Sequence, residues 1–125
     1  RAIGAEHIAV FTDVWKKHAA HAITADLSLE EVVHGAEFFG SDGLILTGRF
    51  TGDQTSVEDL ASARAATRLP VIVGSGATAA NIASMLRHAD AVIVGSSIKR
   101  AGKWANPIDA ARARTIVRAA RRRAR

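Results

Sequence analysis

Three short aliphatic stretches that each run directly into a glycine constrain this chain more than any other feature. They are GLILTG (43–48), VIVGSG (71–76) and AVIVGS (91–96). Uninterrupted aliphatic runs of this length are typical of strands in a parallel sheet that is buried on both faces. A glycine at the carboxyl end of such a strand lets a ligand approach the main chain, and the following helix presents unpaired N–H groups to an anion. The pattern therefore predicts a ligand site at the strand ends.

Strands and helices alternate four times along the chain. The expected strands cover residues 7–14, 43–47, a segment that starts after Pro70, and 91–96. This order is typical of a parallel sheet with right-handed crossovers. Segments 41–48 (SDGLILTG) and 89–96 (ADAVIVGS) also resemble each other position by position, which indicates an internal repeat of one strand–helix unit.

Capping residues predict where the helices begin. Ser28 followed by Glu31 forms a capping box, with Val32, Val33, Ala36 and Phe39 on the expected apolar face and Gly40 at the end of the helix. The next helix is expected over about residues 57–67, with Ser56 or Thr55 as its cap. In the third helix Thr78 is the expected N-cap, and Ile82, Met85 and Leu86 are expected to face inward. The last helix is expected to have Asn106 as cap, Pro107 at its first position and Asp109 at its third.

The expected fold class is α/β, with one domain over residues 1–125. Four strand–helix units cannot close a barrel alone, so the chain is expected to be a parallel (βα)4 half of a TIM barrel. The alternative is a small open doubly wound parallel sheet. Both arrangements place ligands at the carboxyl ends of the strands. The first residue is Arg1 rather than Met, which suggests a piece of a longer protein.

Two consecutive strand ends carry glycine and serine. In GSGATAAN (74–81), main-chain N–H groups and hydroxyls could converge on one phosphate, and the end of the next strand would form the facing wall. The alternative is that these glycines only permit tight turns. The predicted phosphate-binding residues are Gly74, Ser75, Gly76, Ala77, Thr78, Gly95 and Ser96.

The end of the first expected strand, FTDVWKKHAAH, offers candidate catalytic groups. Asp13, Lys17 and His18 could supply a base, a stabilising charge and an acid in one cleft. The alternative is a solvated loop in which Asp13 accepts local hydrogen bonds. A lone pair of aspartate and histidine is a thin basis for a metal site, so no metal site and no cofactor is predicted, and a need for a divalent metal stays open. Asp42 and Asp90 precede their strands and are interpreted as turn and cap residues.

Composition excludes several classes of function. The chain has no cysteine, hence no disulfide and no thiolate chemistry, and no apolar run long enough to span a membrane. Its net charge of +5 comes largely from a cluster of arginines at the end of the sequence. Because no aromatic residues are interleaved with these arginines, we interpret them as a solvated helix face and expect no nucleic-acid partner. A cytoplasmic protein is the default expectation.

Five motifs together resemble the C-terminal half of the BtpA/SgcQ family. They are FTDVWKKHA, GLILTGRFTG, PVIVGSGATAANI, ADAVIVGSSIK and GKWANPIDAAR, and they cover nearly the whole chain in order. The resemblance implies strands five to eight of a (βα)8 barrel similar to the ribulose-phosphate-binding group. It matches Asp13, Lys17 and His18 to the fifth strand end and adds Thr47, Gly48 and Lys99 as substrate-lining residues. Arg49-Phe50 and the arginine tail depart from the family's usual pattern.

The resemblance implies a protein that binds a small phosphorylated metabolite, a sugar phosphate or a nucleotide, and leaves the reaction open. The family is named for a role in photosystem I biogenesis, so the alternative is a non-catalytic biogenesis or assembly factor. In either case the expected partner is the missing N-terminal half-barrel or a second copy in a homodimer, because a half-barrel leaves its interior and its edges uncovered.

Overall fold

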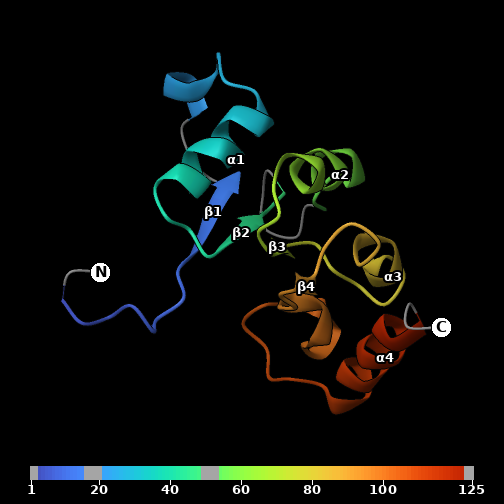
Figure 1. Cartoon of the computed structure of the whole chain (residues 1–125). Coiled ribbons are helices and arrows are strands. Elements are labelled where there is room, and N and C mark those ends of the chain that lie inside the picture. The colour runs from blue at the N-terminus through green and yellow to red at the C-terminus, as the bar shows by residue number, and fades with distance from the viewer. Residues whose placement is uncertain (1–2, 16–20, 49–53, 123–125) are drawn as a thin grey trace.

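The protein is described by a computed structural model that covers residues 3–15, 21–48 and 54–122 (Figure 1). It is an α/β structure with an all-parallel sheet of four strands. The strands are β1 (Phe11–Trp15), β2 (Gly43–Leu46), β3 (Val71–Val73) and β4 (Ala91–Val92). The helices are α1 (Leu29–Phe38), α2 (Val57–Ala66), α3 (Ile82–Met85) and α4 (Ala110–Arg121), with 3-10 turns η1 (His21–Thr24), η2 (Ser96–Ile98) and η3 (Arg100–Gly102).

The strands lie in the sheet in the order in which they occur in the chain, β1-β2-β3-β4. Neighbouring helices also contact each other in chain order, α1 with α2, α2 with α3 and α3 with α4 (Figure 1). A doubly wound sheet reverses its strand order at a switch point, whereas a barrel winds in one direction. The observed order confirms the predicted parallel (βα)4 unit, which is consistent with half of a barrel or with an open parallel sheet.

The two faces of the sheet differ in burial. Leu44 and Leu46 on β2, and Val71 and Val73 on β3, are fully buried in the core that packs against the helices. The side chains between them point to the other face because strand residues alternate. There Ile45 and Ile72 are only partly buried, and further along Ile93 is 51% exposed. One face of the sheet is thus partly uncovered in the chain taken alone, as expected for a half-barrel without its other half. We call the face that carries these three isoleucines the open face.

Local capping signals predicted two helix starts correctly. In the capping box of α1, Glu31 N donates to Ser28 Oγ at 3.2 Å and Ser28 N donates to Glu31 Oε2 at 2.7 Å. At α2, Ser56 Oγ accepts from Asp59 N at 3.1 Å. The expected inward position of Phe39 is wrong, since this residue lies past the end of α1 and is 86% exposed.

Three other elements are shorter than the sequence predicts. β1 begins at Phe11 rather than at residue 7, because Phe11 aligns with Gly43, the first residue of β2, and the residues before it have no strand beside them. β4 ends at Val92, and the chain turns into η2 instead of continuing as a strand to residue 96. α3 comprises only Ile82–Met85, although the carbonyl of Thr78 already accepts from Ile82 N at 3.0 Å.

The last helix starts three residues later than predicted. Asp109 is its N-cap, with Oδ1 accepting from Ala111 N at 2.9 Å and from Arg112 N at 3.2 Å. The Asn106-Pro107 pair does not begin a helix because it is used by tertiary contacts. Pro107 O accepts from Arg100 N at 2.9 Å, and Asn106 Nδ2 donates to Arg100 O at 2.8 Å. None of the helices in the described ranges is long and apolar enough to cross a lipid bilayer.

Candidate ligand site at the ends of β3 and β4

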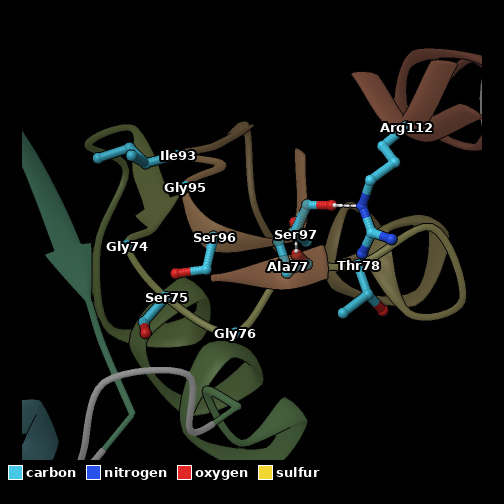
Figure 2. A pocket seen from close by; sticks show the side chains of 11 residues that line it. Gly74, Ser75, Gly76, Ala77, Thr78, Ile93, Gly95, Ser96, Ser97 and Arg112 are labelled. Carbon is cyan, nitrogen blue, oxygen red and sulfur yellow. Dashed lines mark hydrogen bonds between the residues drawn. The ribbon is translucent and has the colours of Figure 1, made fainter. Parts of the chain in front are cut away.

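A cavity of about 340 Å³, which we call the strand-end cavity, lies between the segments that follow β3 and β4 (Figure 2). The structure places all seven of the predicted phosphate-binding residues in its wall. The full set of lining residues is Gly74, Ser75, Gly76, Ala77, Thr78, Ile93, Gly95, Ser96, Ser97, Gly102 and Arg112. Its size is in the range of small-molecule sites, which is roughly 300–1,000 Å³.

Two glycines shape the floor of this cavity for different reasons. At Gly74 a Cβ atom would lie 2.6 Å from Thr47 Cγ2 and 2.8 Å from Ile45 Cγ2, so only glycine fits against β2 here. Gly76 has a φ of +74°, a backbone conformation that side-chain-bearing residues rarely adopt. Gly76 therefore allows a turn in the wall of the cavity that a larger residue would strain.

Several lining residues carry main-chain N–H groups that have no acceptor among the described residues. In the described part of the chain, the N–H groups of Gly76, Ala77 and Ser96 donate to no protein acceptor. Thr78 differs, since its N–H donates to Asn81 Oδ1 at 2.7 Å and its hydroxyl donates to the same oxygen at 3.1 Å. The sequence expectation that Thr78 N–H would face a ligand therefore does not fit the hydrogen bonding seen here.

One hydrogen-bonded chain ties the two strand ends to α4. Ser97 Oγ donates to Ala77 O at 2.6 Å, and Arg112 Nε donates to Ser97 O at 2.8 Å (Figure 2). These bonds connect the segment after β3, the η2 turn and the first turn of α4. Because Nε is anchored, the guanidinium is held at the cavity with its two terminal amino groups donating to no described residue.

Arg112 is the functional candidate that the sequence reading missed. It is the one charged side chain among the described residues that line the strand-end cavity. The predicted helix start at Pro107 would put residue 112 in the second turn. The true cap at Asp109 makes it the third residue of α4, facing the strand ends. The sequence did contain a signal for this later helix start, since aspartate, here Asp109, is a preferred N-cap residue.

The three predicted substrate-lining residues lie outside the wall of this cavity. Thr47 is buried and donates through Oγ1 to Trp15 O at 2.9 Å, so its hydroxyl supports the sheet. Gly48 is buried beside it. Lys99 follows η2 and pairs in an isolated antiparallel bridge with Ile108, which helps to place the start of α4.

The predicted catalytic group is only partly described. Asp13 lies on β1, at the far edge of the sheet from β4, and lines a different cavity together with residues of α1. Lys17 and His18 lie outside the described residues. The structure therefore does not bring Asp13 to the strand-end cavity. Within the described ranges, no group of three histidine, aspartate or glutamate side chains is placed to hold a metal ion.

The carboxyl groups with shifted pKa values lie away from the cavity. A hydrogen bond from Ser62 lowers the pKa of Glu30, and hydrogen bonds from Ser28 lower that of Glu31. A hydrogen bond from its own main-chain N–H, with a smaller contribution from the Ser56 hydroxyl, lowers the pKa of Glu58. These glutamates are in the first turns of α1 and α2. No carboxylate is among the described residues that line the strand-end cavity, so nothing there repels an anion.

Comparison with known proteins gives the family. Residues 1–122 match the BtpA family. The chain belongs to the BtpA family. This confirms the family resemblance that the motifs indicated, over nearly the whole sequence.

Relatives of this BtpA-family chain come from distant organisms. It is 41% identical over 108 residues to an uncharacterized mitochondrial protein of Caenorhabditis elegans, covering 86% of this chain and 39% of the relative. It is 44% identical over 112 residues to an uncharacterized protein of Archaeoglobus fulgidus, covering 90% and 42%. It is 39% identical over 113 residues to the photosystem I biogenesis protein BtpA of Synechocystis, covering 90% and 39%. The chain thus spans about two-fifths of the length of these relatives.

Proposed function

We propose that this BtpA-family chain holds the phosphate group of a small phosphorylated metabolite in the strand-end cavity. The ligand class is a sugar phosphate or a nucleotide. The observation that carries the proposal is the convergence of N–H groups from two neighbouring strand ends with the Arg112 guanidinium on one cavity.

The chemistry of the wall suits a phosphate better than a neutral ligand. The N–H groups of Gly76, Ala77 and Ser96 can each donate to a phosphate oxygen, and charge-assisted hydrogen bonds of this kind are about twice as strong as neutral ones. Arg112 adds a fixed positive charge whose planar fork matches two phosphate oxygens. The hydroxyls of Ser75 and Ser96 lie on the same cavity and can donate further (Figure 2).

The open face supports a second part of the proposal, which concerns the whole protein. Isoleucines that are partly or half exposed line this face, and the chain spans about two-fifths of its relatives. We propose that a second (βα)4 unit covers this face, either the first half of a (βα)8 barrel or a second copy. Asp13, Lys17 and His18 stay the candidate catalytic groups of the completed protein.

The test is a titration of the chain with inorganic phosphate and with sugar phosphates by calorimetry. In Gly95→Asp a carboxylate enters the cavity wall, and a Cβ at residue 95 meets no atom within 4 Å. Gly95→Asn is the matched neutral control. We expect Gly95→Asp to abolish phosphate binding and Gly95→Asn to retain most of it. Equal binding by the two variants would contradict the proposed site, and the far-UV circular dichroism of both variants shows whether they are folded.

A second candidate function comes from the Synechocystis relative, which is named for photosystem I biogenesis and is 39% identical to this chain. Under this alternative the chain is a non-catalytic biogenesis or assembly factor, and its surface rather than its cavity carries the function. The two candidates separate in an affinity pull-down. The assembly factor is favoured if the chain captures a stoichiometric protein partner, Gly95→Asp still captures it, and phosphate esters do not bind.

A further inference from the structure

A second cavity, of about 360 Å³, adjoins the strand-end cavity on the outer side of the sheet. We call it the interhelix cavity because it lies between the segment before α3 and the first turns of α4. The residues that line it are Thr78, Ala79, Ser97, Ala111, Arg112, Thr115 and Ile116. Thr78, Ser97 and Arg112 line both cavities, so these three residues form their common border.

The two cavities differ in chemistry. The strand-end cavity is lined by glycines, serines and main-chain donors. The lining of the interhelix cavity is largely apolar and includes Ala79, Ala111 and Ile116, of which Ile116 is buried. A ligand that extends across the border would therefore meet a polar, anion-binding end and a largely apolar end.

We propose that the interhelix cavity binds the base of a nucleotide whose phosphate lies in the strand-end cavity. This inference rests on the proposed function and selects the nucleotide over the sugar phosphate. A sugar phosphate has no apolar group to place between α3 and α4, whereas a nucleotide carries a flat ring one sugar away from its phosphate.

Arg112 stands where both parts of such a ligand would be recognised. Its Nε is anchored on Ser97 O at 2.8 Å, so the guanidinium plane is fixed at the border of the two cavities. The edge of a guanidinium donates to phosphate oxygens, and its flat face stacks on aromatic rings. The hydroxyl of Thr115, which donates to Ala111 O at 2.9 Å, retains lone pairs for a ring N–H.

The experiment compares ribose 5-phosphate with a purine and a pyrimidine 5′-nucleotide, AMP and UMP, by calorimetry on the chain. We expect at least one nucleotide to bind about tenfold more tightly than ribose 5-phosphate, because the ring adds apolar contact and stacking. Thr115→Trp fills the interhelix cavity from a position that does not line the strand-end cavity. Val117→Trp is the matched control, since Val117 lies on the same helix, is 50% exposed and lines neither cavity.

Thr115→Trp is expected to remove the nucleotide's advantage and to leave the affinity for inorganic phosphate unchanged, while Val117→Trp changes neither. If ribose 5-phosphate binds as tightly as both nucleotides, or if Thr115→Trp leaves the advantage intact, the interhelix cavity is not a base site and the phosphate proposal still stands. If inorganic phosphate and all three esters fail to bind to folded protein, both proposals are overturned.

Discussion

Asp90 and Val71 exchange two hydrogen bonds at the start of β3. Asp90 N donates to Val71 O at 2.8 Å, and Val71 N donates to Asp90 Oδ2 at 2.9 Å. Asp42 makes the same pair of bonds with Val10, at 2.8 and 2.7 Å. Each aspartate stands at the same position of the internal repeat and fixes the start of the preceding strand. The repeat seen in the sequence is therefore a structural repeat, and the prediction that both aspartates are turn and cap residues is confirmed.

Asp90→Ala is expected to lower the free energy of unfolding by about 1–3 kcal/mol, because it leaves the N–H of a fully buried residue without an acceptor. Asp42→Ala should lower the free energy of unfolding by less, since Val10 is 48% exposed and water can replace the carboxylate as acceptor. Urea unfolding curves measure both. Arg64→Ala is the control for the ion pair with Asp90, whose side chains are 45% and 48% exposed, and should cost less than about 1 kcal/mol. Equal losses for the two aspartates would contradict the burial argument.

Gly74→Ala should destabilise the fold by about 1–3 kcal/mol, since the new methyl group overlaps the side chains of Ile45 on β2 and of Thr47 just after it. Gly35→Ala is the matched substitution. Gly35 lies in α1, where a Cβ meets nothing within 4 Å, and alanine favours a helix by roughly 0.5–1 kcal/mol. Thermal unfolding should therefore shift downward for the first variant and upward for the second. A neutral Gly74→Ala would mean that β2 and β3 can separate at no cost.

Ser28→Ala is expected to raise the pKa of Glu31 toward the usual value of 4.5. In the folded chain the main-chain N–H of Ser28 lowers this pKa most, and the Ser28 hydroxyl lowers it further; alanine keeps the first contribution and removes the second, so the expected rise is partial. A lowered folded-state pKa gives stability that is present above the unfolded value and is lost as the pH falls through the folded value. As the pH falls below 4.5, Ser28→Ala should thus lose less stability than the wild-type chain. Carbon-detected NMR titration of the glutamates measures the shift, and Glu58 on α2 serves as the internal reference.

Much of this architecture follows from local signals in the sequence. Two helix starts are fixed by hydrogen bonds between residues close in sequence, at Ser28 with Glu31 and at Ser56 with the acidic residues of the first turn. Such local contacts can be recognised from the sequence pattern. The site residues from Gly74 to Thr78 were also predictable, because Gly74 and Gly76 mark where the chain must turn.

Tertiary contacts explain what the sequence reading missed. Asn106-Pro107 is a strong local start signal for a helix, yet the bonds to Arg100 hold this pair outside the helix, next to the bridge between Lys99 and Ile108. The start of α4 moves to Asp109 as a result, and Arg112 moves to the cavity with it. An uncovered face was expected for a half-barrel, but the strand pattern does not tell that Ile93 lies on it, because alternation alone does not show which face packs against the helices.

Arg112→Ala should weaken inorganic phosphate binding at least tenfold, because it removes the charged side chain of the cavity wall. Arg112→Lys should keep part of the affinity, since it retains the charge and loses the anchor on Ser97 O. Arg114→Ala, two residues along α4 and outside the wall, controls for the loss of one positive charge. Calorimetry at constant ionic strength gives the three affinities for inorganic phosphate. An equal loss of affinity in Arg112→Ala and Arg114→Ala would mean that Arg112 acts only through its charge at long range and does not contact the phosphate.

Ile72→Lys should disrupt association through the open face without unfolding the chain. Ile72 lies between the fully buried Val71 and Val73 and points away from the helices. Phe38→Lys is the matched change on the helix side, where the ring is 84% exposed. Sedimentation velocity should show that the wild-type chain and Phe38→Lys associate, either with a second copy or with a separately added N-terminal half-barrel. Ile72→Lys should sediment as a monomer. If the wild-type chain stays monomeric and does not bind the N-terminal half-barrel either, the proposed completed barrel is contradicted.

The wall of the strand-end cavity is formed mostly by glycine, alanine and serine, so its shape follows the path of the main chain. A point substitution there can block the cavity but has little means of reshaping it. Any change of ligand preference would have to come from its border, through Arg112 and the neighbouring turn of α4. If the proposed phosphate site is correct, the glycine-rich wall would bind the anion and the neighbouring helix would set the ligand preference, so engineered selectivity should begin on the helix and not on the glycines.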